Sequence, residues 1–525
     1  MKHGLCLLLC LCLCLLMPAA VMAENFNPEG LPVVNEPITL RIVAAIDSDM
    51  KDYDEMKLVQ QWEADTGINV EWIQYDTASW NEKKNLMLAS GDLPDVIFGT
   101  LSEYDVLTYA DQGYWMPLQD LIDQYSVNMK NFAENYPEVY NTWFAPDGNL
   151  YKIPRLKGQE DMVWPNRMYI NQTWLDKLGL DMPTTIDELT EVLRAFKTQD
   201  PNGNGLADEI PFAFRTNDPL TSRTAFNRHA LYGFFGTFGR LDAPDHIVLE
   251  DGHAVFTADK EEYKNAVQWL HMAYEEGLMD PEAFTMDAAS YKAKNTASEN
   301  VYGVWTGWTV EEATNPPEQG IEDYAMMPPL VNSNGEQIWP RFGYNVSAAS
   351  GSILITSVNQ YPEATIRFLD YMWEPYFSIQ MDWGIEGLGS QINEDGSWEI
   401  LGGGLKTTRT AEGMAWNVAT CVPQDIYEKC IYTSAVKQFE MDACDVYRPY
   451  GQEMYPGIYF TLEDTQEMQQ YFTDINNYVA KMTAAWVIDG GIEEQWDEYI
   501  NTLNSMGLER YVEIYEENYA RYIAP

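Results

Sequence analysis

Short apolar runs alternate with amphipathic segments in the first part of the chain. Residues 39–45 (TLRIVAA) form an apolar run typical of a buried strand, and residues 55–66 carry apolar side chains at helical spacing. Strand character returns at residues 70–73 and, after a helix-like stretch at 80–89, at residues 96–98. This order predicts an α/β fold with a parallel sheet and helices on its faces.

The pattern becomes mostly helical from Asn171 onwards. Thr185 and Glu188 form a capping-box motif, in which Thr185 caps a helix and Glu188 bonds back to its start. Apolar residues at three-to-four spacing predict helices at residues 174–178, 185–197, 260–276, 361–372, 462–488, 493–506 and 508–522. The second half of the chain is therefore expected to be an α/β region rich in helices.

The N-terminus has the pattern of a secretory signal. Lys2 supplies a positive charge, residues 5–17 are apolar, and small residues lead up to Ala23. The apolar run is shorter than the ~20 residues of a spanning helix, so residues 1–23 are predicted to be a cleaved signal peptide and the protein to be exported. The cysteines in this segment each follow a leucine, which argues against a lipid anchor. An odd number, Cys421, Cys430 and Cys444, remains in the mature chain.

Length and charge exclude several classes of protein. The chain has 525 residues, which is more than one hydrophobic core holds, so at least two domains are expected. It carries 32 basic and 81 acidic residues, a formal net charge of -49. Such a chain is repelled by phosphate backbones and by anionic membrane surfaces, so we expect no nucleic-acid partner and no binding to an anionic membrane surface.

Catalytic signatures are absent from the sequence. There is no nucleophile elbow (G-x-S-x-G), no zinc-protease motif (H-E-x-x-H), no P-loop and no dinucleotide-binding glycine motif. We therefore expect no enzymatic activity and no catalytic residues. A secreted glycoside hydrolase stays open as an alternative, because it needs only two carboxylates.

One loop has the composition of a calcium site. Oxygen-bearing side chains alternate along residues 200–209, and Gly205 permits a sharp turn, as in the first half of an EF-hand loop. The position of the bidentate Glu is instead Pro211, and an ordinary Asn/Gly-rich turn is the alternative. The predicted ligands of a structural calcium ion are Asp200, Asn202, Asn204, the Leu206 carbonyl, Asp208 and Glu209.

Tryptophans near Gly and Pro are the second candidate feature. Trp164, Trp305, Trp308, Trp339 and Trp383, with the stretch 232–236 (YGFFG), have the surroundings of loops. Indole faces stack on the apolar faces of sugars, and neighbouring polar groups bind the hydroxyls. A single Trp is more often part of a core, so the prediction of a sugar site depends on the set.

Five segments together resemble the family 1 extracellular solute-binding proteins of ABC transporters. They are residues 88–97 (LASGDLPDVI), 171–185 (NQTWLDKLGLDMPTT), the 200–211 loop with its Ile-Pro ending, 274–281 (YEEGLMDP) and 383–387 (WGIEG). The resemblance covers nearly the whole mature chain, and the 200–211 loop is similar to the calcium loop of larger members that take up oligosaccharides.

The resemblance implies a two-lobe, periplasmic-binding-protein-like (type II) fold that closes around its ligand by a hinge motion and is recognised by a membrane permease. One lobe would comprise residues 24–155 and about 341–400, and the other, helix-rich lobe residues 156–340 and about 401–525. We expect a secreted or cell-surface monomer that delivers a small solute, a sugar or oligosaccharide, to an ABC permease. A surface sensing or adhesion receptor of the same fold stays open, as do peptides, amino-sugar derivatives and metal chelates as cargo.

The predicted ligand-binding residues are aromatic residues for stacking and charged residues for hydroxyl groups. They are Trp80, Glu103, Trp164, Arg167, Trp305, Trp308, Trp339, Arg341 and Trp383.

Overall fold

The computed structural model describes residues 25–46, 50–216, 227–297, 300–343, 352–401 and 421–524. The predicted signal segment, residues 1–23, lies outside them. The chain divides into two compact units, Met1–Gly158 with Ser347–Ile431 and Gln159–Val346 with Tyr432–Pro525. The chain thus passes from one unit to the other three times, and each unit is discontinuous in sequence. The predicted lobe boundaries stay a prediction.

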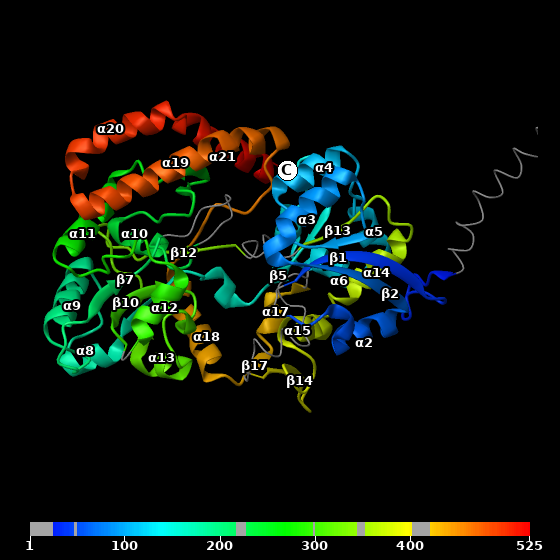
Figure 1. Cartoon of the computed structure of the whole chain (residues 1–525), viewed down its shortest axis with the longest axis horizontal. Helices are drawn as coiled ribbons and strands as arrows, with labels where there is room; N and C mark the ends of the chain where they lie inside the picture. Colours follow the sequence, from blue (N-terminus) through cyan, green and yellow to red (C-terminus); the bar gives the residue numbers. More distant parts are fainter. Residues whose placement is uncertain are drawn as a thin grey trace, which may run out of the picture. The chain divides into compact units, whose positions relative to one another are not determined.

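A mixed five-stranded sheet with the order β2-β1-β3-β13-β4 organises the first unit. β1 pairs in parallel with β2 and β3, whereas β13 is antiparallel to β3 and β4. The predicted strand-helix alternation is confirmed here, and the antiparallel strands are an addition that the sequence pattern did not show (Figure 1). The elements are β1 (Ile38–Ile46), η1 (Tyr53–Glu55), α2 (Lys57–Thr66), β2 (Ile68–Asp76), α3 (Thr77–Ser90), β3 (Val96–Phe98), α4 (Glu103–Asp111), α5 (Gln119–Tyr125), α6 (Asn128–Asn135), α7 (Pro137–Tyr140), η2 (Asn141–Trp143), β4 (Lys152–Pro154), β5 (Leu156–Lys157), β13 (Ser352–Ile355), α14 (Pro362–Tyr371), α15 (Pro375–Trp383), β14 (Ser390–Ile392), β15 (Trp398–Ile400), β16 (Cys421–Val422), α17 (Gln424–Tyr427) and β17 (Cys430–Tyr432), whose last residue begins the second unit's final segment.

A four-stranded sheet with the order β11-β6-β10-β7 lies at the centre of the second unit. Every residue of β6 and β10 is buried, because helices cover the sheet. The elements are η3 (Glu160–Val163), β6 (Arg167–Asn171), α8 (Gln172–Leu178), α9 (Ile186–Thr198), β7 (Ile210–Ala213), α10 (Tyr232–Phe235), η4 (Gly236–Phe238), β8 (Ile247–Glu250), β9 (His253–Phe256), α11 (Glu261–Glu275), α12 (Ala288–Thr296), β10 (Tyr302–Gly307), η5 (Val310–Glu312), α13 (Pro317–Asp323), β11 (Tyr324–Met326), β12 (Trp339–Arg341), α18 (Ala435–Tyr447), η7 (Arg448–Tyr450), β18 (Gly451–Glu453), α19 (Leu462–Asp489), α20 (Ile492–Ser505) and α21 (Leu508–Ile523).

The C-terminal helices form a helical layer of the second unit. α19 packs against α11 and α21, and Figure 1 shows α19, α20 and α21 as neighbouring rods. Their apolar faces join the unit's core through Phe472, Val479, Trp486 and Tyr511. The predicted amphipathic helices of the second half are confirmed.

The capping box before α9 is only half formed. Thr185 Oγ1 accepts from the backbone N–H of Glu188 at 3.3 Å, as predicted. The Glu188 carboxylate, however, accepts from the N–H and hydroxyl of Thr184, at 2.8 and 2.7 Å, because that residue offers both donors together. The helix start is nevertheless held by these three hydrogen bonds.

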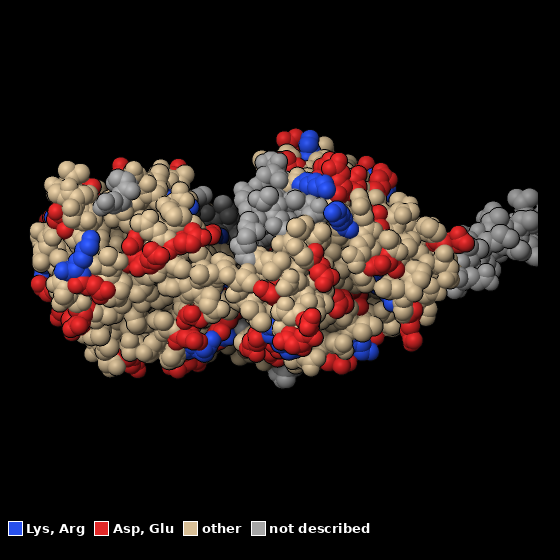
Figure 2. All heavy atoms as spheres, turned by 90° about the horizontal axis from the view of Figure 1, so that it is seen from below, with Lys and Arg blue, Asp and Glu red and all other residues tan. Residues whose placement is uncertain are grey.

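Charge is spread over the surface. On the face drawn in Figure 2, acidic side chains are widespread, and basic side chains stand singly or beside acidic ones. Within the part of the chain that the structure describes, none of the helices combines the length and apolar character needed to cross a membrane.

Candidate functional site

Trp308 lies where the central strand β10 of the second unit ends. Its backbone carbonyl accepts from the hydroxyl of Tyr169 at 2.9 Å, and its indole Nε1 donates to the carbonyl of Asp161 at 3.1 Å. These contacts hold the backbone and the indole of Trp308, yet the residue stays partly exposed. Trp308 therefore offers a rigid aromatic surface.

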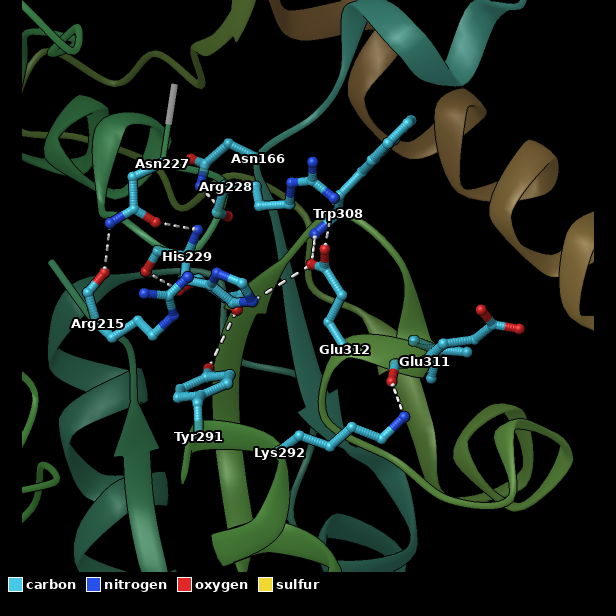
Figure 3. A network of polar contacts seen from close by, with 12 residues as sticks. Asn166, Arg215, Asn227, Arg228, His229, Tyr291, Lys292, Trp308, Glu311 and Glu312 are labelled. Atoms are coloured by element: carbon cyan, nitrogen blue, oxygen red, sulfur yellow. Dashed lines mark hydrogen bonds and ion pairs between the residues drawn. The ribbon is translucent and has the colours of Figure 1, made fainter. Parts of the chain in front are cut away.

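Glu312 of η5 holds three groups around this ring. One carboxylate oxygen accepts from the backbone N–H of Trp308 at 2.7 Å and lies 3.4 Å from Nε2 of His229. The other accepts from Nη1 of Arg228 at 2.9 Å. Figure 3 shows Glu312 between His229 on one side and Arg228 with Trp308 on the other. Gly307 makes this close approach possible, because a Cβ there would lie 3.0 Å from Glu312 Oε2.

Arg228 covers the Trp308 ring. Its guanidinium carbon lies 4.9 Å from the ring centroid, within the range of a cation–π interaction. The side chain is 46% exposed, compared with 16% for Glu312. The backbone beside it is fixed, since Asn166 Nδ2 donates to the Arg228 and Ala230 carbonyls and the Asn227 side chain bridges to Arg215 and His229 (Figure 3).

A buried ionic cluster lies beneath Trp308. Asp161, whose carbonyl accepts from Trp308, also accepts there from Arg167 Nη2 at 3.2 Å, and its carboxylate pairs with Lys437. Lys437 lies 3.4 Å from Glu440, and burial raises the pKa of Glu440 to about 7 although Lys437 and Arg167 act in the opposite direction. Arg167 is fully buried and donates from Nε to the Trp164 carbonyl at 2.9 Å. In this structure Arg167 acts on Trp308 through Asp161.

Trp164, Trp305 and Trp339 are fully buried within the second unit. Trp339 stacks on Tyr447 at 4.7 Å between ring centroids, and Trp305 stacks on Tyr169 at 4.0 Å. The faces of these two indoles are therefore occupied by other rings in this structure. Arg341, at the end of β12, is partly exposed and pairs with Glu453 of β18.

The expectation that these aromatics lie in loops is wrong for most of them. Trp305 is on β10 and Trp339 on β12, Trp80 is within α3, Trp383 ends α15, and the 232–236 stretch is a buried turn of helix, α10 continuing into η4. The glycines near them in space provide room for indole rings. A Cβ would lie 2.6 Å from Trp339 at Gly233, and 2.4 Å from Trp80 at Gly99. The glycines therefore indicate close packing of indole rings against the backbone, and not loops.

The remaining predicted residues lie in the first unit. Trp80 is buried and donates from Nε1 to the Thr100 carbonyl at 2.8 Å, and Trp383 is also buried. Glu103, the first residue of α4, is partly exposed. Burial lowers the pKa of Lys152, and the nearby charge of Glu103 partly offsets this effect.

The 200–209 loop forms a compact turn rich in oxygen atoms. Asp200 accepts from the N–H groups of Gly203 and Gly205, and the Asn202 and Asn204 amides donate to Asp208. Glu209 Oε1 is buried and has no hydrogen-bond partner among the described residues. Burial, followed by the charges of Asp208 and Asp200, raises the pKa of Glu209.

These residues fit a cation. The charges of Asp208 and Asp200 act on Glu209, and Glu209 Oε1 is buried without a donor among the described residues, an arrangement that a bound cation would relieve. Leu206 is 61% exposed on the same loop. The described residues, this loop included, contain no group of three or more His, Cys, Asp and Glu side chains in a metal-binding arrangement. Asn and carbonyl oxygens would therefore have to complete the site.

Sequence reasoning did not identify Arg228, His229 and Glu312. Arg228 and Glu312 are 84 positions apart in the sequence, and the three residues belong to no motif. The structure brings Trp308 together with Arg167 through Asp161, and places Trp80, Glu103 and Trp383 in the other unit.

Comparisons with known proteins agree on one family. Residues 48–375 match the family described as bacterial extracellular solute-binding protein. The chain is 34% identical over 492 residues, 90% of its length and 88% of the relative's, to the fructooligosaccharide ABC transporter substrate-binding protein FusA of Streptococcus pneumoniae.

Solved structures of FusA are similar over almost the whole chain. The complex of FusA with kestose matches with a TM-score of 0.78 and 31% identity, covering 92% of this chain and 99% of that one. An EF-hand mutant of FusA in complex with fructo-nystose gives a TM-score of 0.77 at the same identity and coverage. These relatives are transporter substrate-binding proteins and not enzymes.

Proposed function

This chain belongs to the bacterial extracellular solute-binding protein family, and from that premise we propose that it captures a neutral oligosaccharide and passes it to an ABC permease. The observation that carries the cargo class is the Trp308 ring, which is rigidly held, partly exposed and flanked by Arg228 and Glu312. An aromatic face beside charged hydrogen-bonding groups suits the apolar faces and hydroxyls of a sugar. The fructooligosaccharide cargo of FusA and its complex with kestose support the same class.

Among the predicted ligand residues, Trp308, Arg341 and Glu103 are partly exposed and are proposed to contact the sugar directly. Trp164, Trp305 and Trp339 are proposed to support the site as its packed base, because they are buried among other side chains. Arg167 is buried in the same unit and is proposed to take the same supporting role, whereas Trp80 and Trp383 are buried in the first unit and stay predictions.

The proposal includes a structural calcium ion in the 200–209 loop. Asp200, Asn202, Asn204, the Leu206 carbonyl, Asp208 and Glu209 are the groups that would hold it. Bound calcium supplies a strong positive charge that neutralises these carboxylates and ties the end of α9 to the start of β7. The unpartnered Glu209 oxygen and the EF-hand of FusA support this assignment. Export by cleavage after Ala23 is likewise proposed.

Calorimetric titration of the protein without residues 1–23 tests the cargo. We expect kestose or a related fructooligosaccharide to bind without being hydrolysed, and Trp308→Ala to weaken binding about tenfold or more, the loss typical of a central aromatic contact. Trp496→Ala is the matched control, because Trp496 is also partly exposed under a cation, Lys264, but lies on α20. Equal affinity in wild type and Trp308→Ala, or no binding to any neutral oligosaccharide, would overturn the proposal.

A further inference from the structure

The face of Trp308 is occupied by Arg228 in this structure. A sugar that stacks on this face of the indole would take the place of the guanidinium, which lies 4.9 Å from the ring centroid. The two groups compete for one surface.

The backbone of Arg228 is held by hydrogen bonds, whereas its guanidinium end is exposed. Asn166 Nδ2 donates to the Arg228 carbonyl at 3.0 Å, and the neighbouring His229 N–H donates to Asn227 at 2.9 Å, so the backbone is fixed. The side chain is 46% exposed, and its guanidinium contacts the Glu312 carboxylate and the Trp308 ring. The guanidinium can therefore leave the ring without disturbing the fold.

Glu312 keeps its position when Arg228 moves. Its other oxygen accepts from the Trp308 N–H at 2.7 Å and lies 3.4 Å from His229 Nε2, and the side chain is only 16% exposed. Arg228 can therefore stay paired with the fixed Glu312 carboxylate after its guanidinium has left the ring.

From these contacts we infer that Arg228 is a removable cap on the Trp308 sugar-stacking surface, held over the ring by Glu312 and displaced by the incoming sugar. The inference rests on the proposed function, because it assigns a second role at the same site. The cap lowers the affinity for neutral sugars by the strength of the interaction that must be broken. It also shields the indole from water and from weakly stacking solutes.

Two measurements on three variants test the cap. Arg228→Ala uncovers the ring, Arg228→Lys keeps a charge beside Glu312 but loses the planar stack, and Arg194→Ala removes another partly exposed arginine, which is ion-paired with Glu276. Exposed cation–π contacts are weak, so we expect Arg228→Ala to bind kestose about two- to five-fold more tightly. Arg228→Lys should lie between it and wild type, and Arg194→Ala should match wild type.

The second measurement needs no ligand. Acrylamide quenching of each protein, with the signal of its Trp308→Phe counterpart subtracted, isolates the Trp308 emission, which we expect to be quenched more strongly in Arg228→Ala than in wild type. Unchanged quenching, or weaker kestose binding by Arg228→Ala, overturns the cap and makes Arg228 an ordinary structural or ligand-contacting residue. If wild type binds no neutral sugar, the proposed function fails, and the quenching result still decides whether Arg228 covers the ring.

Discussion

Arg155 donates from Nη2 to Oδ1 of Asp382 at 2.5 Å, and both side chains are almost completely buried, 3% and 2% exposed. The Tyr427 hydroxyl donates to the other oxygen of Asp382 at 3.0 Å. Arg155 lies just before the chain leaves the first unit at Gly158, and Tyr427 just before it leaves again at Ile431. One carboxylate therefore ties together two of the segments that lead out of this unit.

Removing Asp382 should destabilise the protein strongly. Asp382→Ala removes the carboxylate that pairs with the buried Arg155 guanidinium, a change that typically costs about 3–5 kcal/mol. The matched control is Glu191→Ala, which breaks an exposed pair with Arg194 and should cost at most about 1 kcal/mol. Urea denaturation followed by circular dichroism measures both, and equal midpoints for the two variants would contradict the prediction.

Gly158 should not tolerate a side chain. Its N–H donates to the Val422 carbonyl at 2.7 Å, and a Cβ would lie 2.3 Å from the backbone nitrogen of Gln424. Gly158→Ala must push β5 and β16 apart, so we expect a loss of about 1–3 kcal/mol, the usual range for overpacking. Gly343→Ala, where a Cβ meets nothing within 4 Å among the described residues, should change the melting temperature little. Similar melts for the two variants would show that the strand pair yields without cost.

Replacing Glu209 should affect the melting temperature differently with and without calcium. Burial, Asp208 and Asp200 raise the pKa of Glu209, so its ionised form destabilises the loop when no cation is present. In chelator, Glu209→Gln should melt at the wild-type temperature or above it. With calcium at 100 times its dissociation constant, wild type should gain about 2.7 kcal/mol, and Glu209→Gln much less.

Asp251→Asn is the control for this experiment. Asp251 is an exposed carboxylate in a turn, but it lies in the β8–β9 hairpin and not in the 200–209 loop. Its calcium response should equal that of wild type. If neither calcium nor chelator changes the melting temperature of wild type, the loop does not bind calcium.

The buried Glu440 should make stability depend on pH. Burial raises its pKa from 4.5 to about 7. Between these values the folded state holds a proton that the unfolded chain has lost, so this contribution to stability is present at low pH and is lost as the pH rises from about 4.5 to about 7. The melting temperature of Glu440→Gln should therefore fall less across this window than that of wild type.

Asp442→Asn provides the comparison, because Asp442 is on the same helix, α18, but less buried than Glu440. Its melting temperature should follow that of wild type from about pH 5 to about pH 7.5, since this variant keeps Glu440 and the proton that it binds. Parallel pH profiles of Glu440→Gln and wild type would mean that Glu440 does not bind this proton.

Much of the fold was predictable from local pattern. The apolar run at residues 39–45 became β1, and the periodic segment from Leu462 became α19, because the local pattern of apolar residues indicates the type of element. The 200–209 loop was also identifiable from a local pattern, since its candidate ligands are neighbours in the sequence. Five segments in a fixed order were enough to indicate the family.

What the sequence could not determine is which aromatic faces remain open. Trp305 and Trp308 are three residues apart, yet Trp305 is stacked on Tyr169 inside the unit while Trp308 is partly exposed at the end of the strand. The Arg228–Trp308–Glu312 arrangement joins positions up to 84 residues apart, so no local spacing encodes it. By itself the sequence determined many of the elements, the family and a candidate calcium loop. Only the tertiary structure decided which tryptophans are core and which one carries a cap, because burial depends on residues that are distant along the chain.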